Sequence, residues 1–386
     1  MLAGRERALA EVDLEAVRAN VRRLMRDLPD GAVHCAVVKA NGYGHGAVPV
    51  AGAALEAGST WLGVATPGEA EELRAAGFVA PILIFGPMTG AELERAVAAG
   101  AEVVVWSASF LDAALQLGAS VHIKFDSGMG RLGVTEAEAR VLCARAAACG
   151  LLSGLMSHFA TADEEDTTFF EYQLGRFRAL AGDLTGTYPG LLCHTANSAA
   201  TLRGPRSHFG MVRTGIAMYG LAPANDDPSR HGLRPAMKFS SYVAGVRVVA
   251  PGESVGYGRR FVAAEPTRVG IVPIGYADGV NRLLTNRGDV LVAGRRCRIA
   301  GTISMDQLTV RLPADWGRAG DEVVFFGPSG DVPAGDLTSA APRILCEETA
   351  RLLETINYEV VCRVAPRVVR RYRGAAPGAS ADRSRS

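Results

Sequence analysis

The sequence lacks the long apolar run that a membrane-spanning helix needs, since no stretch reaches about 18 uninterrupted apolar residues. Its first residues, MLAGRERALAEVDL, also lack the apolar core of a secretory signal peptide. The seven cysteines are odd in number and show no CxxC spacing, which is typical of a reducing compartment. We therefore expect a cytoplasmic protein.

The sequence also lacks an excess of charge of either sign, with 41 basic residues against 40 acidic ones. Such a balance gives no bulk field that would attract nucleic acid or an anionic membrane. The chain has 386 residues, of which 48% are hydrophobic, so it can bury a large core and form two domains. We expect its partner to be a small molecule.

Eight short apolar runs alternate with amphipathic segments in the first part of the chain. The runs are residues 34–40, 61–66, 81–86, 102–107, 121–126, 152–160, 191–197 and 211–220. Several intervening segments have helical spacing and end in glycine, and a further helix is expected over residues 13–28. Eight equal βα units favour a (β/α)8 barrel of the TIM type over a doubly wound sheet.

The pattern changes after residue 233. Glycine and proline turns separate β-rich runs at residues 239–258, 267–279, 289–301 and 320–327, without long helices between them. We therefore predict a barrel over residues 1–233, a β-rich C-terminal domain over residues 234–372, and a disordered polar tail over residues 373–386.

Polar residues lie at the expected C-terminal ends of the barrel strands. They are Lys39, Lys124, Asp126, Arg131, His158, Asn197, Ser198 and Arg213. In a barrel such residues converge on one face, and the loops after the seventh and eighth strands often bind phosphate. Here those loops offer the Ser198 hydroxyl and the backbone N–H groups of Gly215 and Ile216. With a lysine on the first strand, this arrangement suggests a phosphorylated aldehyde cofactor held as a Schiff base.

The run AVVKANGYGHGA resembles the pyridoxal-phosphate attachment motif of the alanine racemases. Further motifs of that family follow in its order: KFDSGMGRLG, SHFATADE, HTANSAA, VRTGIAMYG, VGYG, PIGYADG, SMDQ and ETINYE. The resemblance extends from about residue 8 to residue 370. It implies an enzyme that interconverts L-alanine and D-alanine on a pyridoxal 5′-phosphate external aldimine and supplies D-alanine for peptidoglycan.

The same resemblance implies two catalytic residues, because racemisation removes a proton from one face of the α-carbon and returns one to the other. Lys39 would carry the cofactor and serve one face. Tyr257, from the partner subunit of a homodimer with shared active sites, would serve the other. His158 and Arg213 would stabilise its phenolate. Arg213 would also leave the cofactor ring nitrogen unprotonated and so disfavour transamination.

The remaining site residues follow from the same motifs. Cofactor binding is implied for Lys39, Tyr43, Arg131, His158, Asn197, Ser198, Arg213, Gly215, Ile216 and Tyr358. Arg131 and the backbone N–H of Met305 would bind the substrate carboxylate, and Lys124 matches a lysine that is often a carbamate. The substrate gate would comprise Asp163, Tyr276, Arg282, Ile356 and Tyr358. Thr302 stands where an arginine is common, and no metal is implied.

Three other functions compete with this one. A racemase of broader or serine preference on the same scaffold stays open, because the sequence does not measure pocket volume. A pyridoxal-phosphate decarboxylase of related fold is disfavoured, because the chain has no Gly-Gly-Gly phosphate loop and offers Arg213 where that class uses a carboxylate. A non-catalytic cofactor carrier is disfavoured by the C-terminal domain. A biosynthetic or catabolic role, and assembly beyond a dimer, are left open.

Overall fold

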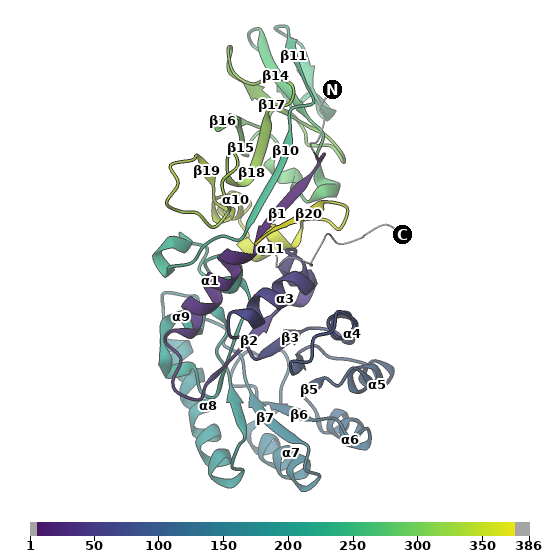
Figure 1. Cartoon of the computed structure of the whole chain (residues 1–386), viewed down its shortest axis with the longest axis vertical. Coiled ribbons are helices and arrows are strands. Elements are labelled where there is room, and N and C mark those ends of the chain that lie inside the picture. The colour runs from purple at the N-terminus through teal and green to yellow at the C-terminus, as the bar shows by residue number, and fades with distance from the viewer. Residues whose placement is uncertain (1–5, 375–386) are drawn as a thin grey trace. The chain divides into compact units, whose positions relative to one another are not determined.

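The computed structural model describes residues 6–374, which divide into two compact units (Figure 1). The barrel unit contains residues 18–43 and 50–218. The C-terminal unit contains the described residues up to 17, residues 44–49 and the described residues from 219 onward.

The barrel unit is built on eight parallel strands, as the sequence predicts. They are β2 (Val33–Val37), β3 (Trp61–Val64), β4 (Ile82–Ile84), β5 (Glu102–Val105), β6 (Val121–Lys124), β7 (Leu152–Met156), β8 (Leu192–His194) and β9 (Met211–Thr214). They pair in the order β9-β2-β3-β4-β5-β6-β7-β8. Backbone hydrogen bonds from Gly210 to Cys193 and from Arg213 to Ala196, each 3.0 Å, link the two outermost strands. The barrel is therefore nearly closed, and the predicted fold class is confirmed.

Helices follow the strands in turn. They are α3 (Ala47–Glu56), α4 (Pro67–Ala75), α5 (Gly90–Ala98), α6 (Ala108–Gln116), α7 (Glu136–Ala148), α8 (Thr168–Thr187) and α9 (Ser198–Arg203), and α1 (Leu14–Met25) precedes the first barrel strand. Figure 1 shows α4, α5, α6 and α7 on the outside of the strands. Capping boxes begin α4, α5 and α7, where a threonine hydroxyl and the glutamate three residues later each satisfy a backbone N–H group.

The C-terminal unit is rich in strands. One sheet has the order β16-β15-β18-β10-β1-β20, with β19 beside β18, and a smaller sheet has the order β11-β14-β17. The strands are β1 (Leu9–Asp13), β10 (Met237–Tyr242), β11 (Gly245–Val249), β12 (Ser254–Val255), β13 (Phe261–Val262), β14 (Thr267–Val272), β15 (Asp289–Val292), β16 (Arg295–Arg298), β17 (Leu308–Leu312), β18 (Glu322–Pro328), β19 (Arg343–Ile344) and β20 (Val369–Arg373). Two short helices, α10 (Cys346–Leu352) and α11 (Asn357–Cys362), complete it.

The first strand of the chain lies in the C-terminal unit rather than with the barrel. Leu9 of β1 stands opposite Ser240 of antiparallel β10 and opposite Val369 of parallel β20. Figure 1 accordingly draws purple β1 between β10 and yellow β20. A five-residue strand whose partners are more than two hundred residues away leaves no local signal of where it pairs.

Two expectations concern the chain ends and the membrane. Strand β20 ends at Arg373, so the first residue of the expected tail is in a strand, and residues 375–386 lie outside the described residues. Among residues 6–374, no helix has the length and apolar character to cross a membrane.

Candidate active site

Lys39 lies two residues past the end of β2, at the start of a left-handed turn. The φ/ψ angles are 53°/49° at Ala40, 51°/50° at Asn41 and 59°/44° at Gly42, and φ is 51° at Tyr43. The Gly42 N–H donates to the Val38 carbonyl over 2.8 Å. Left-handed backbone costs an L-residue about 1–2 kcal/mol, and such strain is typical of functional sites.

Glu69 holds this turn from the neighbouring βα unit. Its Oε1 accepts from the Ala40 N–H over 2.6 Å, and its Oε2 accepts from the N–H groups of Ala65 and Thr66 over 2.7 Å and 3.1 Å. Sequence reasoning missed this residue. The spacing of Thr66 and Glu69 signals a capping box, but nothing local signals the bond to Ala40.

Tyr43, Ser198 and Gly215 come together at the expected phosphate-binding loops. Asn197 caps α9 and accepts from the Ala200 N–H over 3.0 Å. The Ser198 Oγ accepts from the Gly215 N–H over 3.0 Å. A Cβ on Gly215 would stand 2.3 Å from the Tyr43 Oη, so only glycine leaves room for the phenol there. Ile216 follows at the start of a buried turn.

Arg213, on β9, is a buried guanidinium. It donates to the His194 Nδ1 over 2.8 Å, to the Ser157 carbonyl over 2.9 Å and to the His158 Nδ1 over 3.2 Å. Within the described part of the chain, no carboxylate forms an ion pair with it. Burial lowers the pKa of Arg213 to about 10, so it stays charged at neutral pH.

The Arg213 hydrogen bond fixes the protonation of His158. Because a guanidinium only donates, the His158 Nδ1 accepts, and a neutral ring then carries its proton on Nε2. Burial, followed by the charge of Arg213, lowers the pKa of His158 well below its ordinary value. His158 is therefore neutral, with Nε2 available as a donor.

Lys124 ends β6 and is also buried. Burial lowers its pKa to about 8, and the charges of Arg131, Arg213 and Lys39 act in the same direction. Asp126 opposes this shift, but its carboxylate also accepts from three backbone N–H groups, those of Gly128, Met129 and Gly130. The barrel unit thus brings Lys39, Lys124, Arg131 and Arg213 within electrostatic range of one another. This excess of positive charge suits an anionic ligand.

The C-terminal unit brings Tyr257, Tyr276 and Met305 onto adjoining loops. The Thr302 hydroxyl donates to the Tyr257 carbonyl over 2.6 Å, and the Tyr276 N–H donates to the Ser304 carbonyl over 3.1 Å. The side chains themselves are open, with exposed fractions of 73% for Tyr257, 43% for Tyr276 and 52% for Met305. Thr302 is buried, and its hydroxyl supports the Tyr257 turn.

Asp278 was also missed from the sequence, although it lies in the motif PIGYADG. Its buried carboxylate accepts from Arg7 over 2.9 Å, from Arg367 over 2.8 Å and from the Gly275 N–H over 2.9 Å. Burial alone would raise the pKa of Asp278, but these hydrogen bonds outweigh it and hold the pKa below its ordinary value. Asp278 therefore fixes the loop that carries Tyr276.

The other expected gate residues divide between the units. Asp163 is exposed in the barrel unit, in the segment between β7 and α8. Arg282 begins a short 3-10 helix of the C-terminal unit, and Ile356 caps α11, which contains Tyr358. Ile356 has an exposed fraction of 52%.

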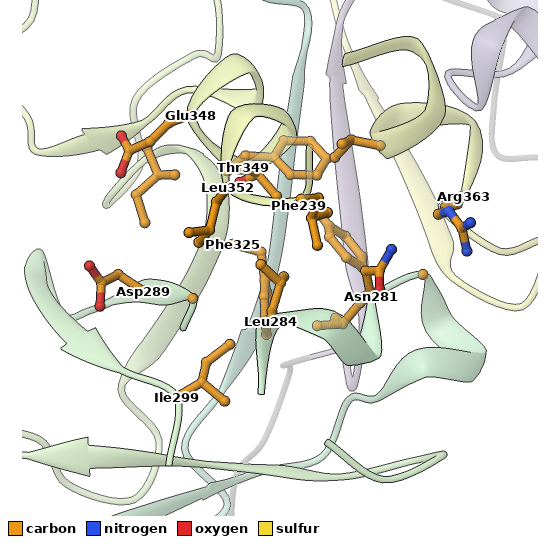
Figure 2. Close-up of a pocket in the computed structure, with 17 residues that line it drawn as sticks. Phe239, Asn281, Leu284, Asp289, Ile299, Phe325, Glu348, Thr349, Leu352 and Arg363 are labelled. Carbon is orange, nitrogen blue, oxygen red and sulfur yellow. The ribbon is translucent and has the colours of Figure 1, made fainter. Parts of the chain in front are cut away.

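An apolar pocket of the C-terminal unit, shown in Figure 2, is separate from these residues. Phe239, Leu284, Ile299, Phe325 and Leu352 are among its lining residues. Its cavity volume of about 40 Å³ has room for water but not for a cofactor. None of the residues expected to bind cofactor or substrate lines it.

Comparisons with known proteins match nearly the whole chain to alanine racemases. The family models "Alanine racemase, N-terminal domain" and "Alanine racemase, C-terminal domain" match residues 12–223 and 236–372. The alanine racemase of Frankia casuarinae is 44% identical, covering 95% of this chain and 96% of its own, and that of Symbiobacterium thermophilum is 41% identical, covering 95% and 97%.

Solved structures show the same likeness. Alanine racemase from D-cycloserine-producing Streptomyces lavendulae superposes with a TM-score of 0.87 at 41% identity, covering 96% of this chain and 97% of that one. Alanine racemase from Bacillus anthracis with bound L-Ala-P gives 0.85 at 36% identity, covering 96% of each chain.

Proposed function

The chain belongs to the alanine racemase family and interconverts L-alanine and D-alanine, and we propose that it does so with pyridoxal 5′-phosphate and two acid–base residues, Lys39 and Tyr257. Four relatives that are 41–44% identical to this chain are alanine racemases, so a broader or serine-preferring activity is not favoured. We place the enzyme in the cytoplasm, where it supplies D-alanine for peptidoglycan.

The observation that carries the proposed cofactor is the cationic cluster of the barrel. Lys39, Lys124, Arg131 and Arg213 all act on the buried His158, and each lowers its pKa. Because like charges gathered in a low dielectric repel one another, the cluster fits a ligand that brings negative charge. The Ser198 hydroxyl and the Tyr43 phenol, which packs against Gly215, add hydrogen-bonding groups for a phosphate.

In this proposal the cofactor-binding residues contact different parts of the cofactor. Lys39 would hold the cofactor through its amine, and Tyr43, Ser198, Gly215, Ile216 and Tyr358 would hold its phosphate. Arg213 would donate to its ring nitrogen, while Asn197 orders the loop that carries Ser198. When bound, the cofactor supplies an electron sink that acidifies the α-carbon of alanine. Arg131, with the backbone N–H of Met305, binds the substrate carboxylate.

Proton transfer needs one group on each face of the α-carbon. Lys39 serves one face, and Tyr257 of the partner subunit serves the other. A phenol is a poor base near neutrality unless donors stabilise its anion. His158 supplies one, because its Nδ1 accepts from Arg213 and its Nε2 proton is free to be donated.

The homodimer in this proposal is supported by the exposed side chains of the C-terminal unit. Tyr257, Tyr276, Met305 and Ile356 are large and each is more than two fifths exposed. Scattered apolar side chains are normal on a monomer, but these lie among the residues expected to form the site and its gate. A second copy that covers them would complete both sites.

Reductive labelling tests the proposal directly. The sequence has three lysines, Lys39, Lys124 and Lys238, so peptide mapping after borohydride reduction has few alternatives. We expect the pyridoxyl group on Lys39, and loss of optical rotation with α-deuterium gain from L-alanine in deuterated water. A label on Lys124 or Lys238, or cofactor-independent racemisation, would contradict it.

A further inference from the structure

Two histidines inside the barrel connect Arg213 to an acidic residue. The Arg213 Nη1 lies 2.8 Å from the His194 Nδ1, and the His194 Nε2 lies 2.7 Å from the His122 Nδ1. The His122 Nε2 then lies 3.0 Å from the Glu102 Oε2. This series of hydrogen bonds runs from β9 through β8 and β6 to the first residue of β5.

The donors and acceptors in this series determine which ring nitrogen of His194 and of His122 carries a hydrogen. Arg213 only donates, so the His194 Nδ1 accepts, and the His194 proton stands on Nε2 and is donated to His122. The His122 Nδ1 therefore accepts, and its Nε2 proton is donated to the Glu102 carboxylate. A positive charge on either ring would place two donors face to face, so both rings are neutral.

The surroundings are shaped around these two rings. His122 and His194 have no exposed surface, and their centroids are 4.9 Å apart at an interplanar angle of 68°. The rings of Trp61 and His122 form a T-shaped pair with their centroids 5.7 Å apart. A Cβ on Gly154 would stand 2.2 Å from the His122 Nδ1, so β7 carries no side chain where the two rings meet.

Glu102 is the anion at the end of this chain. Burial would raise the pKa of Glu102, but hydrogen bonds from His122 and Ser153 outweigh it and hold the pKa below its ordinary value. Arg213, with no carboxylate partner of its own among residues 6–374, thus reaches a counter-charge only through the two imidazoles. The nearby Cys35 thiol is neutral, because burial raises its pKa to about 12.

We propose that Glu102, His122 and His194 form a positioning relay that orients the Arg213 guanidinium toward the cofactor ring nitrogen. The proposal rests on the proposed cofactor. It gives a role to Glu102 and His122, which lie outside the family motifs, and to His194, the first residue of the motif HTANSAA. The carboxylate fixes the His122 tautomer, which fixes that of His194, and so the acceptor that Arg213 meets is always the same nitrogen. A fixed position of Arg213 requires this single tautomer, because a His194 ring with its proton on Nδ1 would point an N–H group at the Arg213 guanidinium, which also only donates.

Side-chain ¹⁵N NMR of histidine measures the relay without any variant and without cofactor. In the apoprotein at neutral pH we expect both His122 and His194 as neutral rings with the proton on Nε2. A proton on Nδ1 of either ring, or a doubly protonated ring, would overturn the proposal. If the wild type bound no cofactor, the proposed function would fail, while the tautomers would still decide the relay.

Glu102→Gln tests the charge, because the amide oxygen can still accept from His122. We expect the cofactor dissociation constant to rise by about fivefold to tenfold, since a hydrogen bond to a neutral group is weaker than one to a carboxylate. The His122 Nε2 proton should shift upfield, and Glu102→Asp should recover part of the affinity. KM for alanine should stay near the wild-type value while kcat falls.

Glu71→Gln is the matched control, because Glu71 forms an exposed ion pair with Arg95 outside the relay. It should leave the dissociation constant and the histidine resonances unchanged. A folded Glu102→Gln protein that binds cofactor as tightly as the wild type would show that Glu102 has only a structural role.

Discussion

The phenol of Tyr43 occupies the space that a side chain on Gly215 would need, since a Cβ there would stand 2.3 Å from the Tyr43 Oη and 2.8 Å from its Cζ. The Gly215 N–H also donates to the Ser198 Oγ. One glycine thus sets the positions of two side chains that we expect to bind phosphate.

Gly215→Ala should therefore displace Tyr43 and weaken cofactor binding. We expect the dissociation constant of pyridoxal 5′-phosphate to rise by at least about tenfold, and the free energy of unfolding of the apoprotein to fall by about 1–3 kcal/mol from overpacking. Absorbance titration and chemical denaturation measure the two effects. Gly175→Ala on α8, where an added Cβ meets nothing within 4 Å, should change neither to this extent. Equal affinities for the two variants would refute a role of Gly215 in the phosphate site.

Glu69→Gln should loosen the Lys39 turn. The Glu69 Oε1 accepts from Ala40 while its Oε2 accepts from Ala65 and Thr66, so an amide places an N–H₂ group against one of these donors. We expect the free energy of unfolding to fall by about 1–3 kcal/mol and the rate of cofactor loss to rise.

Glu92→Gln provides the comparison, because Glu92 forms the same capping box at α5 without a bond to the lysine turn. A glutamine is also accepted at that position of the motif, so we expect a change within about 0.5 kcal/mol. Denaturant titration of both variants measures the difference. If both lost the same stability, the Ala40 contact would contribute nothing.

Lys124 should react with carbon dioxide near pH 8. Only a neutral amine forms a carbamate, and burial, aided by the charges of Arg131 and Arg213, lowers the pKa of Lys124 from 10.5 to about 8. Carbamate formation should therefore increase as the pH rises through about 8. With the amine uncarbamylated, the unfolded chain binds more protons between these two pKa values, so this residue's contribution to stability becomes more favourable as the pH rises from 8 to 10.5.

A ¹³C-labelled bicarbonate solution and ¹³C NMR provide the measurement. The wild type should show a carbamate resonance that Lys124→Arg lacks. Lys238→Arg should keep the resonance, because the Lys238 ammonium is held in an ion pair with Glu322 at 2.6 Å. A resonance that survives in Lys124→Arg would exclude this assignment.

The sequence predicted the barrel because each strand is a short apolar run followed by a helical segment with its own start and stop signals. It also predicted that Lys39 lies near a strand end. It did not predict the left-handed turn, because Ala40 and Tyr43 rarely adopt positive φ and only the contact of Ala40 with Glu69 reveals what holds them. The sequence also did not predict strand β1, because its partners β10 and β20 lie far away along the chain.

Local motifs predicted some polar residues of the site, while others depend on long-range contacts. Lys39, Arg213 and Ser198 could be named because they lie within motifs on or just after barrel strands. Glu102 and His122 could not, because a single glutamate and histidine on barrel strands have no spacing that points to Arg213. Their role depends on which strands close the barrel and on the empty position at Gly154.

Complementation tests the shared site. Lys39→Ala and Tyr257→Phe homodimers should each be inactive. An equal mixture re-associated at random should recover about a quarter of the wild-type activity per site, because about half of the dimers are hybrids and one of the two sites in each hybrid is intact. Racemase activity and native mass spectrometry measure recovery and hybrid formation. Mixing Lys39→Ala with the double variant should recover nothing. Hybrids that form and stay inactive would contradict a Tyr257 contributed by the partner subunit.

Thr302→Val should slow racemisation by acting on Tyr257. The Thr302 hydroxyl donates to the Tyr257 carbonyl over 2.6 Å, and valine keeps the shape of the side chain while removing that donor. A Cβ on the neighbouring Gly256, whose φ is 74°, would stand 3.1 Å from the Thr302 backbone nitrogen, so the turn passes close to Thr302. We expect kcat to fall by about fivefold to tenfold, the loss of one hydrogen bond, with a smaller change in KM.

Thr309→Val is the matched control, since the Thr309 hydroxyl donates to the Ala300 carbonyl in the same unit without touching the Tyr257 turn. Both variants lose one threonine-to-backbone hydrogen bond, so both should lose similar stability. Only Thr302→Val should lower kcat, and the solvent isotope effect on proton transfer at the Tyr257 face should change in that variant alone. Equal kcat values for the two would show that the Thr302 bond supports the fold and does not position Tyr257.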